Sequence, residues 1–257
     1  MAETNPTLAL RGVSKRFGAV QALYRVDFEV RSGEVMALVG DNGAGKSTLI
    51  KGVAGIHAFD EGEIEFEGRP VTIDGPRDAA ALGIEVVYQD LALADNLDVV
   101  ANMYLGREQV SRIVLDEPTM EGACRSTLDS LSVTSLRSVR QAVAGLSGGQ
   151  RQAVAVAKAV MWNSKVVILD EPTAALGVAQ TRQVLDLVRR LGDRGLGVVI
   201  ISHNLHDIFE VADRITVLRL GQNVAEYTRT ETNQQQVVEA ITAGNLSKVP
   251  GQSEAVA

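Results

Sequence analysis

The sequence predicts an α/β fold in which a core with a parallel sheet carries an N-terminal antiparallel β subdomain and an inserted α-helical subdomain. Residues 8–13 and 20–30 alternate apolar and polar side chains, which is the pattern of half-buried antiparallel strands. Residues 35–39, 166–169 and 197–201 contain no polar side chain, and such runs are typical of strands buried on both faces of a parallel sheet. The two patterns indicate two different sheets in one chain.

The remaining elements follow in chain order. A helix is expected to begin near Lys46, and residues 63–73 and 84–88 are strand-like. Between residues 91 and 162 the strand signal fades and helical patterns replace it, which indicates the insertion. Its helices are expected at 98–105, 118–131 and 149–162. The alternation of strands and helices then returns, with helices at 178–191, 205–211 and 232–240 and a hairpin of residues 215–220 and 222–227.

These elements fit one domain over residues 1–245. Its core is expected to comprise about residues 1–90 and 163–245, and the helical subdomain about residues 91–162. The polar residues 246–257 are expected to form a flexible tail. A chain of 257 residues, of which 46% are hydrophobic, is large enough for a domain with such an inserted arm.

Composition argues against several classes of protein. The net charge is −7 and there is no long basic run, so a nucleic-acid surface is not indicated. The sequence does not exclude local basic patches. The N-terminus lacks the layout of a signal peptide, and no segment approaches the ~20 apolar residues of a membrane span. The single Cys124 excludes an intramolecular disulfide and suits an apolar helix position better than a nucleophile. We therefore expect a cytoplasmic protein whose membrane role comes through a partner.

Residues 40–48 match the phosphate-loop pattern G-x-x-x-x-G-K-[ST], between a buried strand and a helix. Glycines let backbone N–H groups curl around phosphate oxygens, and the helix N-terminus adds its positive dipole. Lys46 is expected to reach the β- and γ-phosphates, and Ser47 to bind Mg²⁺. The pattern predicts a P-loop NTPase core. The ATP-binding residues expected in this phosphate loop are Gly40, Asp41, Asn42, Gly43, Ala44, Gly45, Lys46, Ser47 and Thr48.

A second anion site is expected at residues 146–150, the LSGGQ segment, which consists of Leu146, Ser147, Gly148, Gly149 and Gln150. The serine and the two glycines open the helix that is expected from about residue 149. Bare N–H donors together with a hydroxyl suit a phosphate oxygen. The chain thus carries two phosphate-binding helix ends, one on the core and one on the arm.

With these motifs the chain resembles the ATP-binding subunits of ABC transporters over nearly its whole length. The matching strings, in the family's order, are GDNGAGKST (40–48), Gln89 in VYQD, LSGGQRQ (146–152), VVILDEPT (166–173) and ISH (201–203). In that family two domains face head to tail, and the phosphate loop of one and the LSGGQ segment of the other enclose each ATP. The resemblance implies a homodimer that uses ATP and Mg²⁺.

The resemblance also gives roles to single residues. Phe17 lies where the family stacks an aromatic ring on adenine, the alternative being a core phenylalanine. Gln89, at the join to the arm, resembles the glutamine that reaches Mg²⁺ and the attacking water. His203 follows an apolar strand and resembles the histidine that contacts the γ-phosphate. His57 and His206 lack such a context and are expected at the surface or as caps.

The string LDEPT occurs at residues 115–119 and again at 169–173, and only the second copy is expected to be catalytic. Asp170 and Glu171 follow an apolar strand, so Asp170 can hold Mg²⁺ and Glu171 can act as the base or orienter for attacking water. The run before Asp116 is shorter and contains a charge, and a helical pattern follows it. Asp116 suits an N-cap and the next two residues a first turn, so the first copy is expected to start a helix.

One position departs from the family. Most members place an Asp soon after the catalytic segment, where this chain has Gly177, which puts communication across the dimer in doubt. The strings EPTAALGV, VYQDLAL and ISHNLHDIFEVADRI resemble the carbohydrate-importer branch, and the fructose- and ribose-type importers most closely. Many ATPases of that branch are two fused copies, and the single copy here again implies a homodimer.

The leading hypothesis is an ATP-hydrolysing subunit of a monosaccharide importer, peripheral on the cytoplasmic side of the membrane. ATP-driven dimer closure would act on a permease through residues 90–105, and a periplasmic or extracellular sugar-binding protein would supply the sugar indirectly. No nucleic acid is expected as a partner. The alternatives are a soluble non-transport ABC ATPase, which usually has coiled coils or paired domains, and a regulatory nucleotide-binding module, which the intact catalytic residues disfavour.

Overall fold

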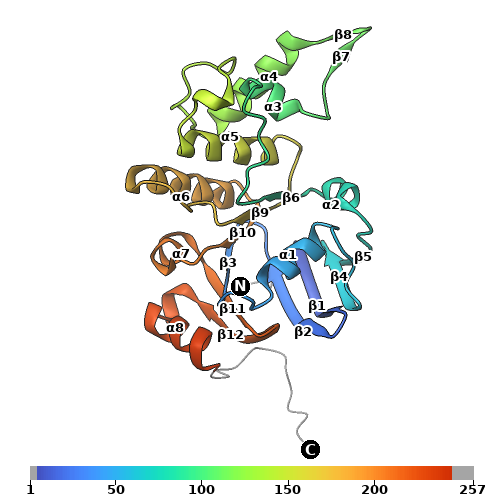
Figure 1. Cartoon of the computed structure of the whole chain (residues 1–257), viewed down its shortest axis with the longest axis vertical. Coiled ribbons are helices and arrows are strands. Elements are labelled where there is room, and N and C mark those ends of the chain that lie inside the picture. Colours follow the sequence, from blue (N-terminus) through green and yellow to red (C-terminus); the bar gives the residue numbers. More distant parts are fainter. Residues whose placement is uncertain (1–4, 245–257) are drawn as a thin grey trace, which may run out of the picture.

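The computed structural model describes residues 5–244, and its centre is a six-stranded sheet (Figure 1). The strands are β3 (Val35–Val39), β6 (Ile84–Val87), β9 (Val166–Asp170), β10 (Gly197–Ile201), β11 (Arg214–Arg219) and β12 (Gln222–Thr228). Their order is β12-β11-β3-β10-β9-β6, with β12 antiparallel to β11 and every other pair parallel. The expected parallel sheet is confirmed, and the expected final hairpin closes one of its edges.

Both faces of this sheet are covered, which explains the apolar runs. Every residue of β3 and β10 is buried. Val35, Ala37 and Val39 pack into the hydrophobic cluster that includes the helical subdomain, whereas Met36 and Leu38 pack into the cluster that includes the β subdomain. Successive side chains of a strand point to opposite faces, so a strand between two cores has no polar position. The helices of this core are α1 (Lys46–Val53), α6 (Val178–Asp193), α7 (Leu205–Val211) and α8 (Gln234–Ala243).

The N-terminal β subdomain is a second, antiparallel sheet. Its strands are β1 (Leu8–Phe17), β2 (Val20–Val30), β4 (Glu61–Phe66) and β5 (Arg69–Val71), in the order β2-β1-β4-β5. Residues 63–73, expected as one strand-like segment, turn back at Glu67 and Gly68, both of which have positive φ. A helix that the sequence analysis missed, α2 (Pro76–Leu82), follows; its first turn is marked by a proline and by Asp78, whose carboxylate accepts from Gly75 N.

The helical subdomain contains α3 (Val99–Tyr104), α4 (Glu117–Ser130) and α5 (Gly148–Val160), close to the expected positions. Its core includes Met103, Tyr104, Cys124 and Leu131. A small hairpin of β7 (Val110–Ser111) and β8 (Val114–Leu115) projects at the end remote from the core sheet (Figure 1). Strands of two residues are too short to leave a periodic pattern, which is why the sequence did not predict them.

Among residues 5–244, no helix is both long and apolar enough to cross a membrane. The tail that the sequence predicts at residues 246–257 lies outside the described residues. The boundaries expected for the two subdomains stay predictions.

The buried cysteine leads to a first testable prediction. Burial, together with the nearby carboxylates of Asp98 and Glu121, raises the pKa of the Cys124 thiol to about 12. Because the thiolate is the nucleophile, the native protein should react with a thiol reagent at pH 8 at least about 100-fold more slowly than the unfolded chain. The sequence has one cysteine, so a spectroscopic labelling assay reports on this site alone. A native rate within tenfold of the unfolded rate would contradict the packing of α4 against α3.

Candidate active site

The carboxyl ends of β3, β9 and β10 meet beside one cavity with a volume of about 320 Å³. The predicted site residues that line it are Asn42, Gly43, Ala44, Gly45, Lys46, Ser47, Thr48, Gln89, Asp170, Glu171 and His203. Gly40 and Asp41 lie against an adjoining cavity, which His203 also lines. Val20, Gln21 and Ala22 of β2 complete the wall and were missed, because nothing in an alternating strand distinguishes them.

The phosphate loop connects β3 to α1 and requires glycine at two of its positions. Gly40 has φ 152°, and a Cβ there would lie 2.2 Å from the carbonyl oxygen of Leu218. Gly45 has φ 104°, and a Cβ there would lie 2.9 Å from the carbonyl oxygen of Ala22. Both positions combine a left-handed backbone with a close approach to another backbone, so only glycine fits. These contacts fix the curvature of the loop.

Lys46 is a buried cation in this loop. Its Nζ donates to the carbonyl oxygens of Gly40, at 2.7 Å, and Asp41, at 3.0 Å. Burial lowers the pKa of Lys46, while the carboxylates of Glu171 and Asp170 act in the opposite direction. A buried ammonium with only carbonyl partners gains strongly from an anionic oxygen. The geometry suits a phosphate group lying over the loop.

The acidic pair lies at the end of β9. Asp170 is the last residue of the strand, and Glu171 follows with φ 51°, an uncommon conformation for a residue other than glycine. The backbone N–H of Glu171 donates to the carbonyl of Ile201 at 2.9 Å, which ties this turn to β10. Burial raises the pKa of both carboxyl groups. A carboxylate with a raised pKa is a better proton acceptor, which suits a general base.

His203 faces Glu171 from the end of the neighbouring strand β10. Its Nε2 lies 3.1 Å from Glu171 Oε1, and its backbone N–H donates to Glu171 Oε2 at 3.4 Å. The imidazole is largely exposed to the cavity, whereas the Glu171 side chain is mostly buried. The structure therefore brings these two predicted site residues together.

Three oxygen-bearing side chains on the cavity wall can hold a hard cation. Ser47 offers a hydroxyl, Gln89 an amide carbonyl and Asp170 a carboxylate, from three different segments. Within the described residues, no group of three or more His, Cys, Asp or Glu side chains is arranged to hold a metal. Mg²⁺ binds through few protein oxygens, keeping waters and substrate phosphates as its other ligands. These residues fit that mode of binding.

Phe17, at the end of β1, is 49% exposed and is not a core residue. Its ring packs against the ring of His57 in an edge-to-face arrangement, with the centroids 5.4 Å apart, and His57 packs in the same way on Phe59 at 6.2 Å. His57 is therefore not the surface or capping residue that was expected, but a half-buried support for Phe17. His206 is exposed in the first turn of α7, as expected.

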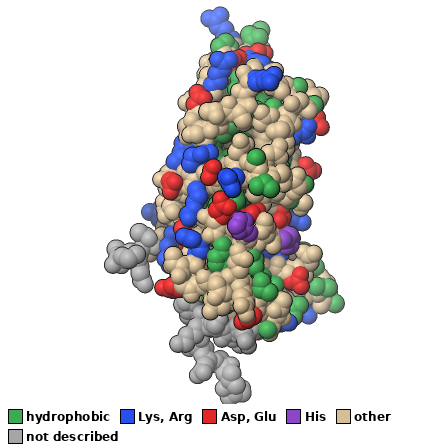
Figure 2. All heavy atoms as spheres, turned by 90° about the vertical axis from the view of Figure 1, so that its left-hand side faces the viewer, with side chains coloured by type: hydrophobic (Ala, Val, Ile, Leu, Met, Phe, Trp, Pro, Cys, Tyr) green, Lys and Arg blue, Asp and Glu red, His purple; other side chains and the backbone are tan. Residues whose placement is uncertain are grey.

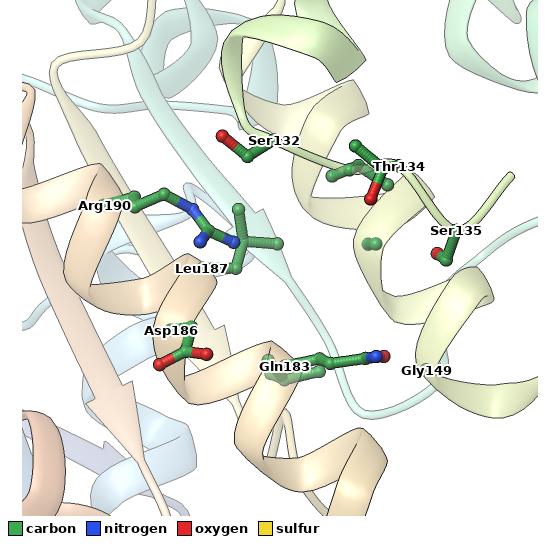
Figure 3. A pocket seen from close by; sticks show the side chains of 11 residues that line it. Ser132, Thr134, Ser135, Gly149, Gln183, Asp186, Leu187 and Arg190 are labelled. Carbon is green, nitrogen blue, oxygen red and sulfur yellow. The ribbon is translucent and has the colours of Figure 1, made fainter.

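The LSGGQ segment lies elsewhere on the chain. Ser147 is the N-cap of α5: its hydroxyl accepts from Gln150 N at 3.3 Å, and Gln150 Oε1 accepts from Ser147 N at 2.9 Å. Gly149 lines a different cavity of about 190 Å³ between α5 and α6, where the Gln183 side chain points toward it (Figure 3). None of residues 146–150 lines the phosphate-loop cavity. The two anion-binding helix ends of one chain therefore do not share a site.

The first LDEPT copy starts a helix, as expected. The Asp116 carboxylate accepts from Thr119 N at 3.2 Å and caps α4. Glu117 is ion-paired with Arg140 at 3.0 Å, and Leu115 is exposed on the short β8. The second copy instead ends a strand whose apolar residues are all buried. The same five letters thus have different structures in different surroundings.

The sequence matches the ABC transporter family model over residues 23–174. It is 48% identical to the xylose/arabinose import ATP-binding protein XylG of Sulfolobus acidocaldarius, over 94% of this chain and 96% of that protein. It is also 48% identical to the fructose import ATP-binding protein FrcA of Rhizobium meliloti, over 88% of this chain and 92% of that protein. Identity to the ribose import ATP-binding protein RbsA of Yersinia pestis is 40% over 94% of this chain, which spans 47% of that relative.

Solved structures agree with the sequence comparison. An ATP-binding cassette of an ABC transporter in its ADP conformation superposes with a TM-score of 0.79 at 28% identity, covering 93% of this chain and 96% of that chain. A nucleotide-free cassette from an ABC transporter gives a TM-score of 0.79 at 26% identity, covering 93% and 95%. The chain therefore belongs to the ABC transporter family, and its fold is that of an ATP-binding cassette.

Proposed function

We propose that this chain is the ATP-hydrolysing subunit of an ABC importer that takes up a monosaccharide through a membrane permease. The observation that carries the proposal is the meeting of the phosphate loop, Gln89, Asp170, Glu171 and His203 at one cavity. Relatives named for the import of xylose, arabinose, fructose and ribose support a sugar as the cargo. They favour transport over the alternatives of a non-transport ATPase and a regulatory module.

In this proposal the phosphate loop binds the triphosphate of ATP, with Lys46 on the β- and γ-phosphates. The exposed part of the Phe17 ring stacks on adenine, and His57 supports that ring through its edge-to-face contact. Ser47, Gln89 and Asp170 hold Mg²⁺, which would neutralise phosphate charge when bound.

Glu171 orients the attacking water and accepts its proton, and His203 donates a hydrogen bond to the γ-phosphate. Their contact in the structure places both side chains on the same wall of the cavity. The raised pKa of Glu171 makes it a stronger base than an exposed glutamate. These roles assign one hydrolytic site to each chain.

A homodimer would complete the site. The LSGGQ segment lies outside the phosphate-loop cavity of its own chain, so a second copy would bring its Ser147 and α5 N-terminus to the γ-phosphate. Two nucleotides would then lie between two chains. Gly177 is the N-cap of α6 and has no side chain, so communication across the dimer at this point would use other groups.

The surface that couples to the permease is proposed at residues 90–105, which follow Gln89. Asp95 in this segment is ion-paired with Arg151 of α5 at 3.0 Å, and Arg151 also donates to the carbonyl of Leu146. The segment is thus tied both to the cavity and to the LSGGQ segment. Basic and acidic side chains are interspersed on the face shown in Figure 2, so that face lacks the uniformly basic surface of a nucleic-acid-binding protein. The chain would lie on the cytoplasmic side of the membrane, with the sugar-binding protein on the other.

The proposed function can be tested by crosslinking an affinity-tagged chain in intact cells and purifying it from the membrane fraction. We expect a polytopic permease as the main partner, and ATP hydrolysis by the complex that rises when a transported sugar and its binding protein are added. A variant with Asp95 and Asn96 exchanged for lysine should recover less permease. Recovery of ribosomes or nucleic acid without a permease would contradict the proposal.

The two LDEPT copies provide a matched pair of variants. Glu171→Gln removes the proton acceptor and should lower kcat for ATP hydrolysis by about 100-fold or more, while the Kd for ATP stays within about threefold. Glu117→Gln removes only an exposed ion pair and should keep kcat within about twofold. Phosphate release and equilibrium ATP binding measure both quantities. If Glu117→Gln lost activity and Glu171→Gln kept it, the assignment would be wrong.

Adenine stacking gives another prediction. Phe17→Ala should weaken ATP binding by about 1–3 kcal/mol, or roughly 5- to 150-fold in Kd, because a base–aromatic stack is lost. Tyr24→Ala is the control, since Tyr24 is similarly exposed, at 47%; neither ring lines the phosphate-loop cavity, so the comparison tests a contact with the base at Phe17 alone. Titration with a fluorescent ATP analogue measures both. Equal losses in the two variants would show that Phe17 does not contact the base.

A further inference from the structure

The carboxylate of Asp207 connects the two turns that carry the catalytic side chains. Asp207 lies in the first turn of α7 and is 3% exposed. Its Oδ2 accepts from the hydroxyl of Thr173 at 2.7 Å, and its Oδ1 accepts from the side-chain amide of Asn204 at 2.8 Å. Asp207 does not line the phosphate-loop cavity.

The two partners of Asp207 occupy matching positions in the turns that follow two neighbouring strands. Thr173 stands two residues after Glu171 in the turn that leaves β9, and Asn204 follows His203 in the turn that leaves β10. These strands are parallel neighbours, with Ile201 in register with Asp170. One carboxylate therefore fixes the backbone just beyond the proposed base and just beyond the proposed γ-phosphate ligand.

The turn after β9 needs such support. Glu171 has φ 51° and Ala175 φ 60°, and residues other than glycine keep this conformation only where their surroundings impose it. The bond from Glu171 N to the Ile201 carbonyl holds the start of the turn, and the bond from Thr173 to Asp207 holds its middle. On the other side, Asn204 N donates to Ser202 Oγ at 3.1 Å, and Asn204 Oδ1 accepts from His206 N at 3.0 Å.

Asn204 is the N-cap of α7 and Asp207 lies in its first turn, where a carboxylate is favourable, but this local role does not explain the bond to Thr173. A buried carboxylate held by two neutral donors is costly to desolvate, and an apolar side chain would fill the same space at lower cost. What a fully satisfied buried polar network supplies is a fixed orientation of the segments it joins. Both segments joined here carry a residue of the proposed site.

We propose that Asp207 is a positioning residue for ATP hydrolysis, which holds Glu171 and His203 in a fixed arrangement relative to each other through Thr173 and Asn204. The inference rests on the proposed ATPase function of the site. It adds a link from Thr173, the last residue of the second LDEPT copy, to Asp207, which does not line the cavity and to which no motif gives a role.

The test compares three single variants of the full chain. Thr173→Val removes the donor to Asp207 with little change in shape and should lower kcat for ATP hydrolysis at least about tenfold, while KM and the Kd for ATP stay within about threefold. Thr173→Ser keeps the hydroxyl and should stay within about twofold of the unchanged chain. Thr216→Val makes the same chemical change at a buried threonine of β11 whose hydroxyl lies 3.5 Å from the Met36 sulfur, and should leave kcat within about twofold.

Asp207→Leu provides an independent arm and replaces Thr173→Val if that variant does not fold. Leucine has a similar length and no acceptor for either Thr173 or Asn204, so kcat should again fall about tenfold with KM nearly unchanged. In the double variant with Thr173→Val, the loss should be no greater than that of the worse single variant, because both act through one bond.

The test separates a failure of the proposed ATPase function from a failure of the positioning role. If the unchanged chain and Thr216→Val show no ATP hydrolysis, the proposed function itself is wrong. If they hydrolyse ATP and Thr173→Val does so equally fast per folded molecule, or if Thr173→Ser is as impaired as Thr173→Val, the positioning role of Asp207 is wrong.

Discussion

The site depends on the parallel pairing of β3, β10 and β9. Ile201 at the end of β10 is in register with Leu38 on one side and with Asp170 on the other. The loops that leave these strands therefore open on the same edge of the sheet, where ligands bind in open α/β folds. A slip of one residue in either pair would turn every side chain of the strand to the opposite face. Because both faces are fully packed, such a slip would disrupt two cores, and the register is held firmly.

The register also decides what a short motif can do. Asp170 and Glu171 are delivered by a buried strand to a loop that already holds a buried cation, Lys46. Asp116 and Glu117 follow two exposed strand residues and stand at the start of a helix. There the Asp116 carboxylate accepts from a backbone N–H of the first turn, and Glu117 forms an ion pair with Arg140. Identical letters thus serve as a proposed catalytic pair in one place and as a helix cap in the other.

Much of this could be predicted from the sequence, because strong local rules act on it. The phosphate loop follows from backbone sterics at Gly40 and Gly45, and the strands 35–39 and 197–201 follow from burial on both faces. The hairpin of β7 and β8 was missed because two-residue strands show no period. The start of α8 was placed two residues early, because Asn233 rather than an earlier residue caps it. The packing of His57 on Phe17 and the hydrogen bond from Thr173 to Asp207 join residues far apart in the chain, and no local sequence pattern predicts such contacts.

The central claim is that each chain holds one nucleotide at the carboxyl edge of its parallel sheet. The most direct measurement is an experimental structure of the Glu171→Gln variant with Mg²⁺ and ATP. The account predicts one ATP per chain, with its triphosphate over Lys46, its adenine on Phe17 and its γ-phosphate within reach of His203. A nucleotide bound instead beside residues 115–119, or a phosphate loop without nucleotide at saturating ATP, would contradict it.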